Sequence, residues 1–280
     1  MTTAPNTLPA FPPPAPAPKP DRTLRNALLA LGSALIVGLL LIGGVQFALA
    51  GTGEDQSGSY TQAGSFRTLD IDTSAANVSV RYGTVSEARI DFDSGGSPLR
   101  YEQRLTGDTL EVGVHNRGWW IFGIVGGFEP ATLQITLPSA LAPVAVSLES
   151  SAGNSDLDGD FAALDLESSA GNIQVTGSAD SLHASSSAGD LTADDLAVSG
   201  EVETESSAGT TELTFTALPS SIEMDSSAGD IRVALPSGSY EIRTDTSVGS
   251  VELGVPSTPG ASRQYSFETS AGDIVLLPAP

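Results

Sequence analysis

The sequence contains no cysteine, one lysine and two histidines among its 280 residues. Without cysteine the fold has no disulfides, and thiolate metal sites and cysteine nucleophiles are excluded. The formal net charge is −22, and residues 118–231 contain neither lysine nor arginine. A surface of this charge repels a phosphate backbone, which argues against nucleic acid as a partner.

Recognisable catalytic motifs are missing as well. His115 and His183 lie in unlike contexts, and neither belongs to a serine-hydrolase motif. Carboxylates are plentiful, but no pair stands out as acid and base, so a carbohydrate-active solenoid enzyme is the least favoured alternative. Calcium-binding glycine–aspartate nonapeptides and EF-hand loops are also missing. We therefore predict no enzymatic activity, catalytic residue, cofactor or metal ligand.

One uncharged apolar stretch, from Ala27 to Ala50, is long enough to cross a hydrocarbon layer of about 30 Å. Three basic residues precede it and two acidic residues follow it, so the positive-inside rule places the N-terminus in the cytoplasm. We predict a transmembrane helix over residues 23–50 and a single-pass protein of the cell membrane with an extracytoplasmic C-terminal domain. The alternative is a signal peptide cleaved after Ala50, because Ala48-Leu49-Ala50 resembles a small-residue cleavage site.

Composition divides the rest of the chain. Residues 1–22 are rich in proline, which has no N–H to donate, and they predict a disordered cytoplasmic tail. Residues 51–65 are predicted to be a polar linker. An initial coil with antiparallel strands is expected over residues 66–145, followed by regular β-solenoid repeats over residues 146–278.

The repeats are marked by a Ser-Ala-Gly motif that recurs every 18 to 23 residues. Apolar residues alternate on both sides of it, which is typical of strands with one buried face. A coil of this length cannot bury a core alone, so the coils are predicted to stack about 4.8 Å apart in parallel sheets. The glycines of the motif are Gly153, Gly171, Gly189, Gly209, Gly229, Gly249 and Gly272.

Small residues flank each of these glycines. Serine or threonine three positions earlier, and alanine or Val248 one position earlier, are predicted to point inward. The inward hydroxyls are expected to form ladders from coil to coil.

An earlier coil is predicted in FRTLDIDTSAANVSVRYG, where Ala76 takes the place of the glycine. The stretches ARIDFD, LRYEQRL, TLEVGVH and ATLQITL then predict antiparallel strands that cap the first coils. The last coil, which ends in DIVLLPAP, is expected to expose a sheet edge. Pro278 and Pro280 would discourage further stacking there, and otherwise the edge would mediate self-association.

These features resemble a family of bacterial "putative adhesin" domains of unknown function, which are toastrack-like β domains of the cell envelope. The resemblance rests on the early coil, the phrase ATLQITLPSALAPVAVSLESSAG and the serial SSAGD units, and it covers residues 66–278. It agrees with an all-β fold: a parallel β-solenoid of about seven to eight short coils with an antiparallel excursion near its N-terminal end. It implies a non-enzymatic adhesion or interaction module. The alternative is an envelope-stress sensor or scaffold that partners membrane regulators.

Two columns of polar residues are expected on the outside of the stack. Carboxylates about 5 Å apart repel one another, so such columns form either a solvated face, which we prefer, or a site for a divalent cation. Four positions before the glycines stand Glu149, Glu167, Ser185, Glu205, Asp225, Asp245 and Glu268. One position after them stand Asn154, Asn172, Asp190, Thr210, Asp230, Ser250 and Asp273.

The segment GWWIFGIVGGF is the candidate interaction patch, because so apolar a loop must be buried or bound. It is expected either to cover the open end of the solenoid or to contact the membrane interface or a partner. The predicted partners are the membrane, through the helix Ala27–Ala50, and an envelope protein or surface glycan. The residues of the patch are Trp119, Trp120, Ile121, Phe122 and Phe128.

Overall fold

The structure is a computed structural model that describes residues 57–97, 99–116 and 130–280. The chain divides into two compact units, Met1–Gly51 and Thr52–Pro280. The predicted tail and transmembrane helix therefore lie outside the described residues. Among the residues that are described, no helix has the length and apolar character needed to span a bilayer.

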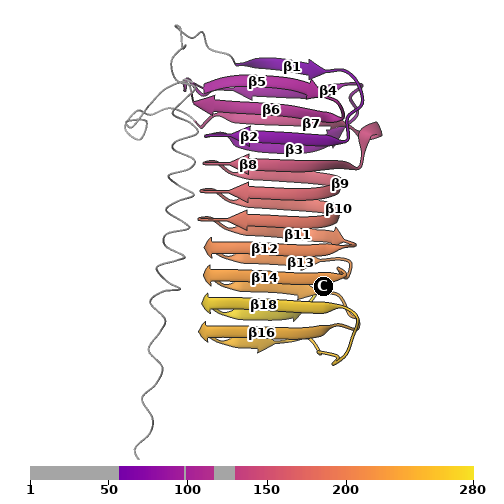
Figure 1. The fold of residues 1–280 in the computed structure, drawn as a ribbon, viewed down its shortest axis with the longest axis vertical. Coiled ribbons are helices and arrows are strands. Elements are labelled where there is room, and N and C mark those ends of the chain that lie inside the picture. Colours follow the sequence, from indigo (N-terminus) through magenta and orange to yellow (C-terminus); the bar gives the residue numbers. More distant parts are fainter. Residues whose placement is uncertain (1–56, 98, 117–129) are drawn as a thin grey trace, which may run out of the picture. The chain divides into compact units, whose positions relative to one another are not determined.

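The second unit is all-β and consists of two facing layers of strands (Figure 1). Layer 1 has the spatial order β5 (Leu99–Thr106), β6 (Thr109–Asn116), β2 (Thr68–Thr73), β8 (Val144–Ser150), the second halves of β9 (Ser155–Ser168) and β10 (Ile173–Ser186), β12 (Glu201–Ala208), β14 (Ser221–Ala228), β18 (Gln264–Ala271) and β16 (Glu241–Val248).

Layer 2 begins with antiparallel strands and continues in parallel. Its order is β1 (Gly58–Gln62), β4 (Ala88–Asp93), β7 (Thr132–Pro138), β3 (Asn77–Gly83), the first halves of β9 and β10, β11 (Leu191–Val198), β13 (Thr211–Phe215), β15 (Ile231–Leu235), β19 (Ile274–Pro278) and β17 (Val251–Leu253). A short 3-10 helix, η2 (Ser139–Leu141), connects β7 to β8. At about 4.8 Å per strand, the stack is about 45–50 Å long.

The Ser-Ala-Gly corners connect layer 1 to layer 2 and lie in one column, as predicted. A methyl group on Gly171 would overlap the carbonyl oxygen of Gly153, and one on Gly189 would overlap that of Gly171. Gly153 makes the same approach to the carbonyl of Ala76, which confirms the place of Ala76 in the column. Most of these glycines also have a positive φ, for example +137° at Gly171. Close contact between coils thus requires glycine at this corner.

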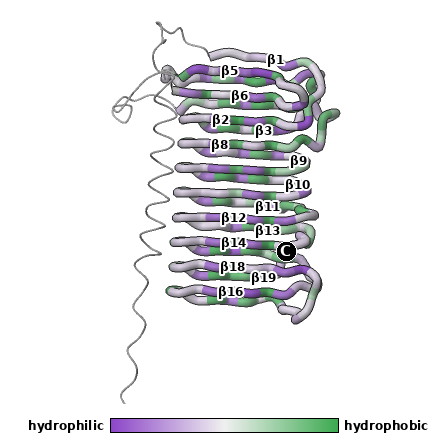
Figure 2. The backbone as a smooth tube through the Cα atoms, in the orientation of Figure 1, coloured by the Kyte–Doolittle hydropathy of each residue, from purple (hydrophilic) through white to green (hydrophobic). Residues whose placement is uncertain are grey.

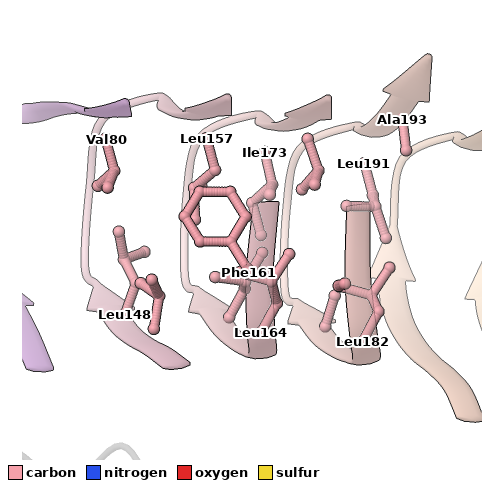
Figure 3. Packing of buried hydrophobic residues seen from close by; sticks show 14 of the residues in the cluster. Val80, Leu148, Leu157, Phe161, Leu164, Ile173, Leu182, Leu191 and Ala193 are labelled. Atoms are coloured by element: carbon pink, nitrogen blue, oxygen red, sulfur yellow. The ribbon is translucent and has the colours of Figure 1, made fainter. Parts of the chain in front are cut away.

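The core lies between the two layers. Leu148 and Leu164 of layer 1 point toward Leu157 and Ile173 of layer 2 (Figure 3), and all four are at most 1% exposed. Apolar and polar residues alternate along the strands (Figure 2), so each strand contributes one face to this core. Every coil shares its apolar contacts with two neighbours, because a single coil has no interior of its own.

The small residues one and three positions before the corner glycine differ in burial. The serine or threonine three positions before the glycine is buried, as predicted, except in the terminal coil, where Thr246 is half-buried. The alanine or Val248 one position before the glycine is exposed from Ala170 onward, because the strand turns there. The hydroxyls of Ser168 and Ser186 donate to the carbonyl of the glycine in their own corner. The predicted continuous hydroxyl ladder is therefore wrong for these coils, since the nearest free acceptor lies within the same turn.

The first strands differ from the predicted antiparallel cap. β6 pairs in parallel with β2, and β7 pairs in parallel with β3, so these two strands form one more coil beyond the first. Their inward residues are fully buried like those of any other coil, which explains the pairing. Among the described strands, antiparallel pairing is confined to β1 with β4, β4 with β7 and β5 with β6. β1 also lies within the predicted linker. It is held there by Tyr60, whose ring stacks on that of Tyr101 with 4.2 Å between the ring centroids.

The last coil in sequence is not the last coil in space. β18 lies between β14 and β16, and β19 lies between β15 and β17. Tyr265 and Phe267 of β18 are at most 1% exposed, whereas Ile242 and Thr244 occupy the matching positions in β16. The coil with the larger apolar residues takes the interior place because it has more surface to bury. The exposed edge is thus at residues 241–253 and not at DIVLLPAP.

Candidate functional surfaces

The outward side of layer 1 presents the predicted carboxylate column. Glu149 lies beside Glu167, and Glu205 lies beside Asp225 in the neighbouring coil. Asp72 continues the column beyond Glu149, and Asp245 and Glu268 exchange places because of the inserted coil. A second acidic row runs beside it: Glu111, Asp70, Asp165, Glu203 and Glu223, interrupted by Ser147 and His183. These two rows are called the acidic face below.

Few cations offset this charge. The Nδ1 atom of His183 lies 3.3 Å from Oε2 of Glu203, and the Nδ1 atom of His115 lies 3.9 Å from Oδ1 of Asp72. Arg243 is the arginine at the far end of the second row, opposite Ser266. The face thus carries rows of carboxylates about 4.8 Å apart, and its charge is complementary to a basic surface.

Mutual repulsion is concentrated where β2 meets β6 and β8. Burial raises the pKa of Asp70, and the charges of Glu111 and Asp72 raise it further. Burial also raises the pKa of Glu149, with smaller contributions from Asp72 and its neighbours. Both carboxylates therefore release their protons less readily than in water, and a cation placed against this part of the face would relieve the repulsion.

A hollow of about 520 Å³ opens at the same place, next to Gly113. Gly113 occupies an outward position beside Asp72, and a methyl group there would meet the Nε2 atom of His115. Arg100 and Arg104 approach from β5, so the lining is of mixed charge. Among the described residues, no group of three or more acidic or histidine side chains is arranged to hold a metal ion.

The second predicted column, one residue after the glycines, makes backbone contacts between coils. The Oδ1 atom of Asn154 accepts a hydrogen bond from the amide of Asn172 at 2.9 Å, and Oδ1 of Asn172 accepts from the amide of Asp190 at 2.9 Å. Asp273 accepts from the amide of Ser250 at 2.8 Å, which lowers the pKa of this carboxyl. The side-chain oxygens of this column accept hydrogen bonds from backbone amides of the neighbouring coil and thus hold neighbouring corners together.

The candidate patch Trp119, Trp120, Ile121, Phe122 and Phe128 lies outside the described residues. A different apolar surface, not predicted from the sequence, lies at the β16 and β17 end of the stack. Val248, Val251 and Leu253 of the terminal coil are 70%, 40% and 50% exposed. The sequence signal was weak: in this repeat the usual alanine before the glycine is replaced by valine, and two inward positions of β16, Thr244 and Thr246, are threonines.

Solved structures from several bacteria are similar to this chain. A "putative adhesin" of Bacteroides fragilis shares 14% identity, and the match covers 82% of this chain and 100% of that chain with a TM-score of 0.52. A "putative adhesin" of Parabacteroides merdae shares 13% identity over 80% and 98% of the two chains, with a TM-score of 0.44. A "putative cell adhesion protein" of Clostridium sporogenes shares 11% identity over 80% and 100%, with a TM-score of 0.42.

A search of the curated proteins found no match. The family comparison did: the Toastrack DUF4097 family matches residues 66–277, which is most of the chain and nearly all of the described stack. The chain therefore belongs to the Toastrack DUF4097 family.

Proposed function

We propose that this protein is a membrane-anchored, extracytoplasmic interaction module of the cell envelope, and that it acts in adhesion without catalysis. The observation that carries the proposal is the acidic face, a flat and regular surface presented by a stack of coils that brace one another. Such a surface offers many weak charge contacts at once, and its repelled carboxylates gain from a cationic partner. The adhesive role is supported by the names of structures with the same fold.

The partner is best described as a basic surface on an envelope protein. A neutral surface glycan would contact the serines of the face but would leave the carboxylate repulsion in place. The raised pKa values of Asp70 and Glu149 thus favour the basic protein over the glycan.

The binding test compares two triple variants of equal charge. Glu167→Gln, Glu205→Gln and Asp225→Asn neutralise three exposed carboxylates of the acidic face. Binding of this variant to native envelope fractions should fall at least tenfold and should lose most of its dependence on salt. A matched control neutralises Asp156, Asp158 and Glu212, which are exposed on the outside of layer 2. Equal loss of binding in both variants would show that the face has no specific role.

The anchoring part of the proposal rests on the uncharged stretch Ala27–Ala50. The full chain should sediment with membranes, and protease added from outside should digest residues after 51 while the N-terminal tail is protected. A chain that lacks residues 1–50 should be recovered without membranes. A secreted product that begins at Gly51 would overturn the anchor and indicate a cleaved signal peptide.

A further inference from the structure

The two ends of the stack are closed to different degrees. At the β1 and β5 end, the side chain of Gln103 in layer 1 donates to the carbonyl of Thr61 and to Oε1 of Gln62 in layer 2. Tyr60 stacks on Tyr101 beneath these contacts. The core is therefore covered at this end. At the β16 and β17 end, within the described residues, β16 pairs only with β18 and β17 only with β19.

Part of the β16 edge is covered by the loop that follows β17. The amide of Ile242 donates to Oγ of Ser257 at 2.9 Å, and the amide of Thr258 donates to the carbonyl of Tyr240 at 2.8 Å. The amide of Glu241 points away from this edge and donates to the carbonyl of Arg263, the residue just before β18. By the alternation of a strand, the peptide groups of Thr244 and Thr246 point into the open edge.

Layer 2 offers a second open edge at the same end. The amide of Gly254 donates to Leu276, and the carbonyl of Ser250 accepts from Ile274. Val251 and Leu253 therefore direct their peptide groups away from β19. The terminal coil thus has two free strand edges, separated by the thickness of the core, with exposed valine and leucine side chains between and beside them.

We propose that a second copy of this chain docks on the open end, tail to tail. Two free edges at a fixed separation need a partner with two edges at the same separation, and a second copy provides this by symmetry. A two-fold axis that crosses both layers would pair β16 with its own copy and β17 with its own copy, antiparallel in each case. Such a pair joins two identical ends, so the β1 and β5 end takes no part in it.

Charge and shape select the register of this pairing. An axis at Asp245 would place two carboxylates directly opposite each other, which is unfavourable. An axis at Thr244 would place the partner strand on Ser257 and Thr258, which already cover the edge. An axis at Thr246 avoids both problems, because Asp245 then lies opposite a serine of the partner strand. Thr246, three residues before Gly249, and Val251, two residues after it, are the inward positions nearest the corner in their layers, so Val251 would face its own copy in layer 2.

The direction in which the chain runs through the stack gives the tail-to-tail contact a function in adhesion. The chain enters the stack beside β1, at the end opposite β16 (Figure 1). A tail-to-tail pair would therefore place its two N-terminal ends about 90–100 Å apart. If each N-terminus is anchored as proposed above, the pair would link two facing membranes through a homotypic contact. This adhesive use rests on the proposed function, whereas the pairing itself does not.

The absence of cysteine makes the pairing easy to test. In Val251→Cys the two sulfurs would be the only thiols of the pair, and directly opposite residues in an antiparallel pair have Cα atoms about 5.5 Å apart, within disulfide range. The full-length variant should form a covalent dimer under mild oxidation that reductant reverses. The matched control is Ser59→Cys, exposed on β1 at the covered end. Equal crosslinking of the two variants would overturn the pairing.

A second variant separates pairing from adhesion. Val251→Asp should weaken self-association at least tenfold in sedimentation velocity while thermal unfolding stays unchanged, because the side chain is exposed. Self-association that persists in this variant would also overturn the pairing. Beads coated with the wild-type chain should cluster, and beads coated with Val251→Asp should not. Crosslinking without clustering would leave the pairing intact and refute its adhesive use, whereas envelope binding without crosslinking would leave only the proposed function.

Discussion

The substitution Gly171→Ala tests the stacked corner directly. The new methyl group would overlap the carbonyl oxygen of Gly153, and the φ of +137° is strained for any residue with a Cβ. The backbone strain costs about 1–3 kcal/mol. Relief of the overlap would displace one or two hydrogen bonds between corners, such as that from the amide of Gly171 to the carbonyl of Ala188, at about 1 kcal/mol each. The expected loss in free energy of unfolding is about 2–5 kcal/mol.

Two control substitutions separate the causes. Gly229→Ala produces a similar overlap, with the carbonyl of Gly209, but without a left-handed backbone, so it measures the overlap alone. Gly107→Ala has a φ of +60° and no atom within 4 Å of the new methyl, so it measures the backbone alone and should cost about 1 kcal/mol. Denaturant unfolding followed by circular dichroism gives all three values. A Gly171→Ala variant within 0.5 kcal/mol of Gly107→Ala would refute the close-contact explanation.

Three further predictions concern the corner ladder, the acidic face and the order of the coils. Asn172→Ala removes an amide acceptor between coils and should lower the free energy of unfolding by about 1–2 kcal/mol in the same denaturation assay. Asp72→Asn should lower the pKa of Asp70 in a carboxyl NMR titration; because that pKa is raised in the folded chain, the variant should be more stable at pH 7, and the gain should fade as the pH drops toward about 4. Phe267→Ala should cost about 3–5 kcal/mol and Val248→Ala less than about 0.5 kcal/mol by denaturation, and the reverse ranking would contradict the inserted coil.

Much of the fold follows from local pattern. The spacing of Gly153 and Gly171 predicted the column, because only glycine permits that approach of backbones. The two-residue alternation also predicted which side of the strand Glu149 and Glu167 occupy. Both properties depend on a residue and its immediate neighbours, so a single sequence contains enough information to find them.

The order of the end coils could not be predicted in this way. All coils offer the same backbone register, so β16 and β18 can each pair with β14 equally well by pattern. The choice depends on which side chains gain more from burial, Tyr265 and Phe267 or Ile242 and Thr244, and this is a property of the whole stack. The exposed end was missed for the same reason, since it is defined by the coil that is left outside.

The inserted C-terminal coil affects how the stack responds to force. In a stack that follows chain order, tension on the C-terminus would peel the end coil away one hydrogen bond at a time. Here β18 and β19 leave from the interior, held by β14 and β15 on one side and by β16 and β17 on the other. A pull on Pro280 therefore loads two rows of hydrogen bonds at once, so this coil resists unravelling although it follows the other coils in sequence.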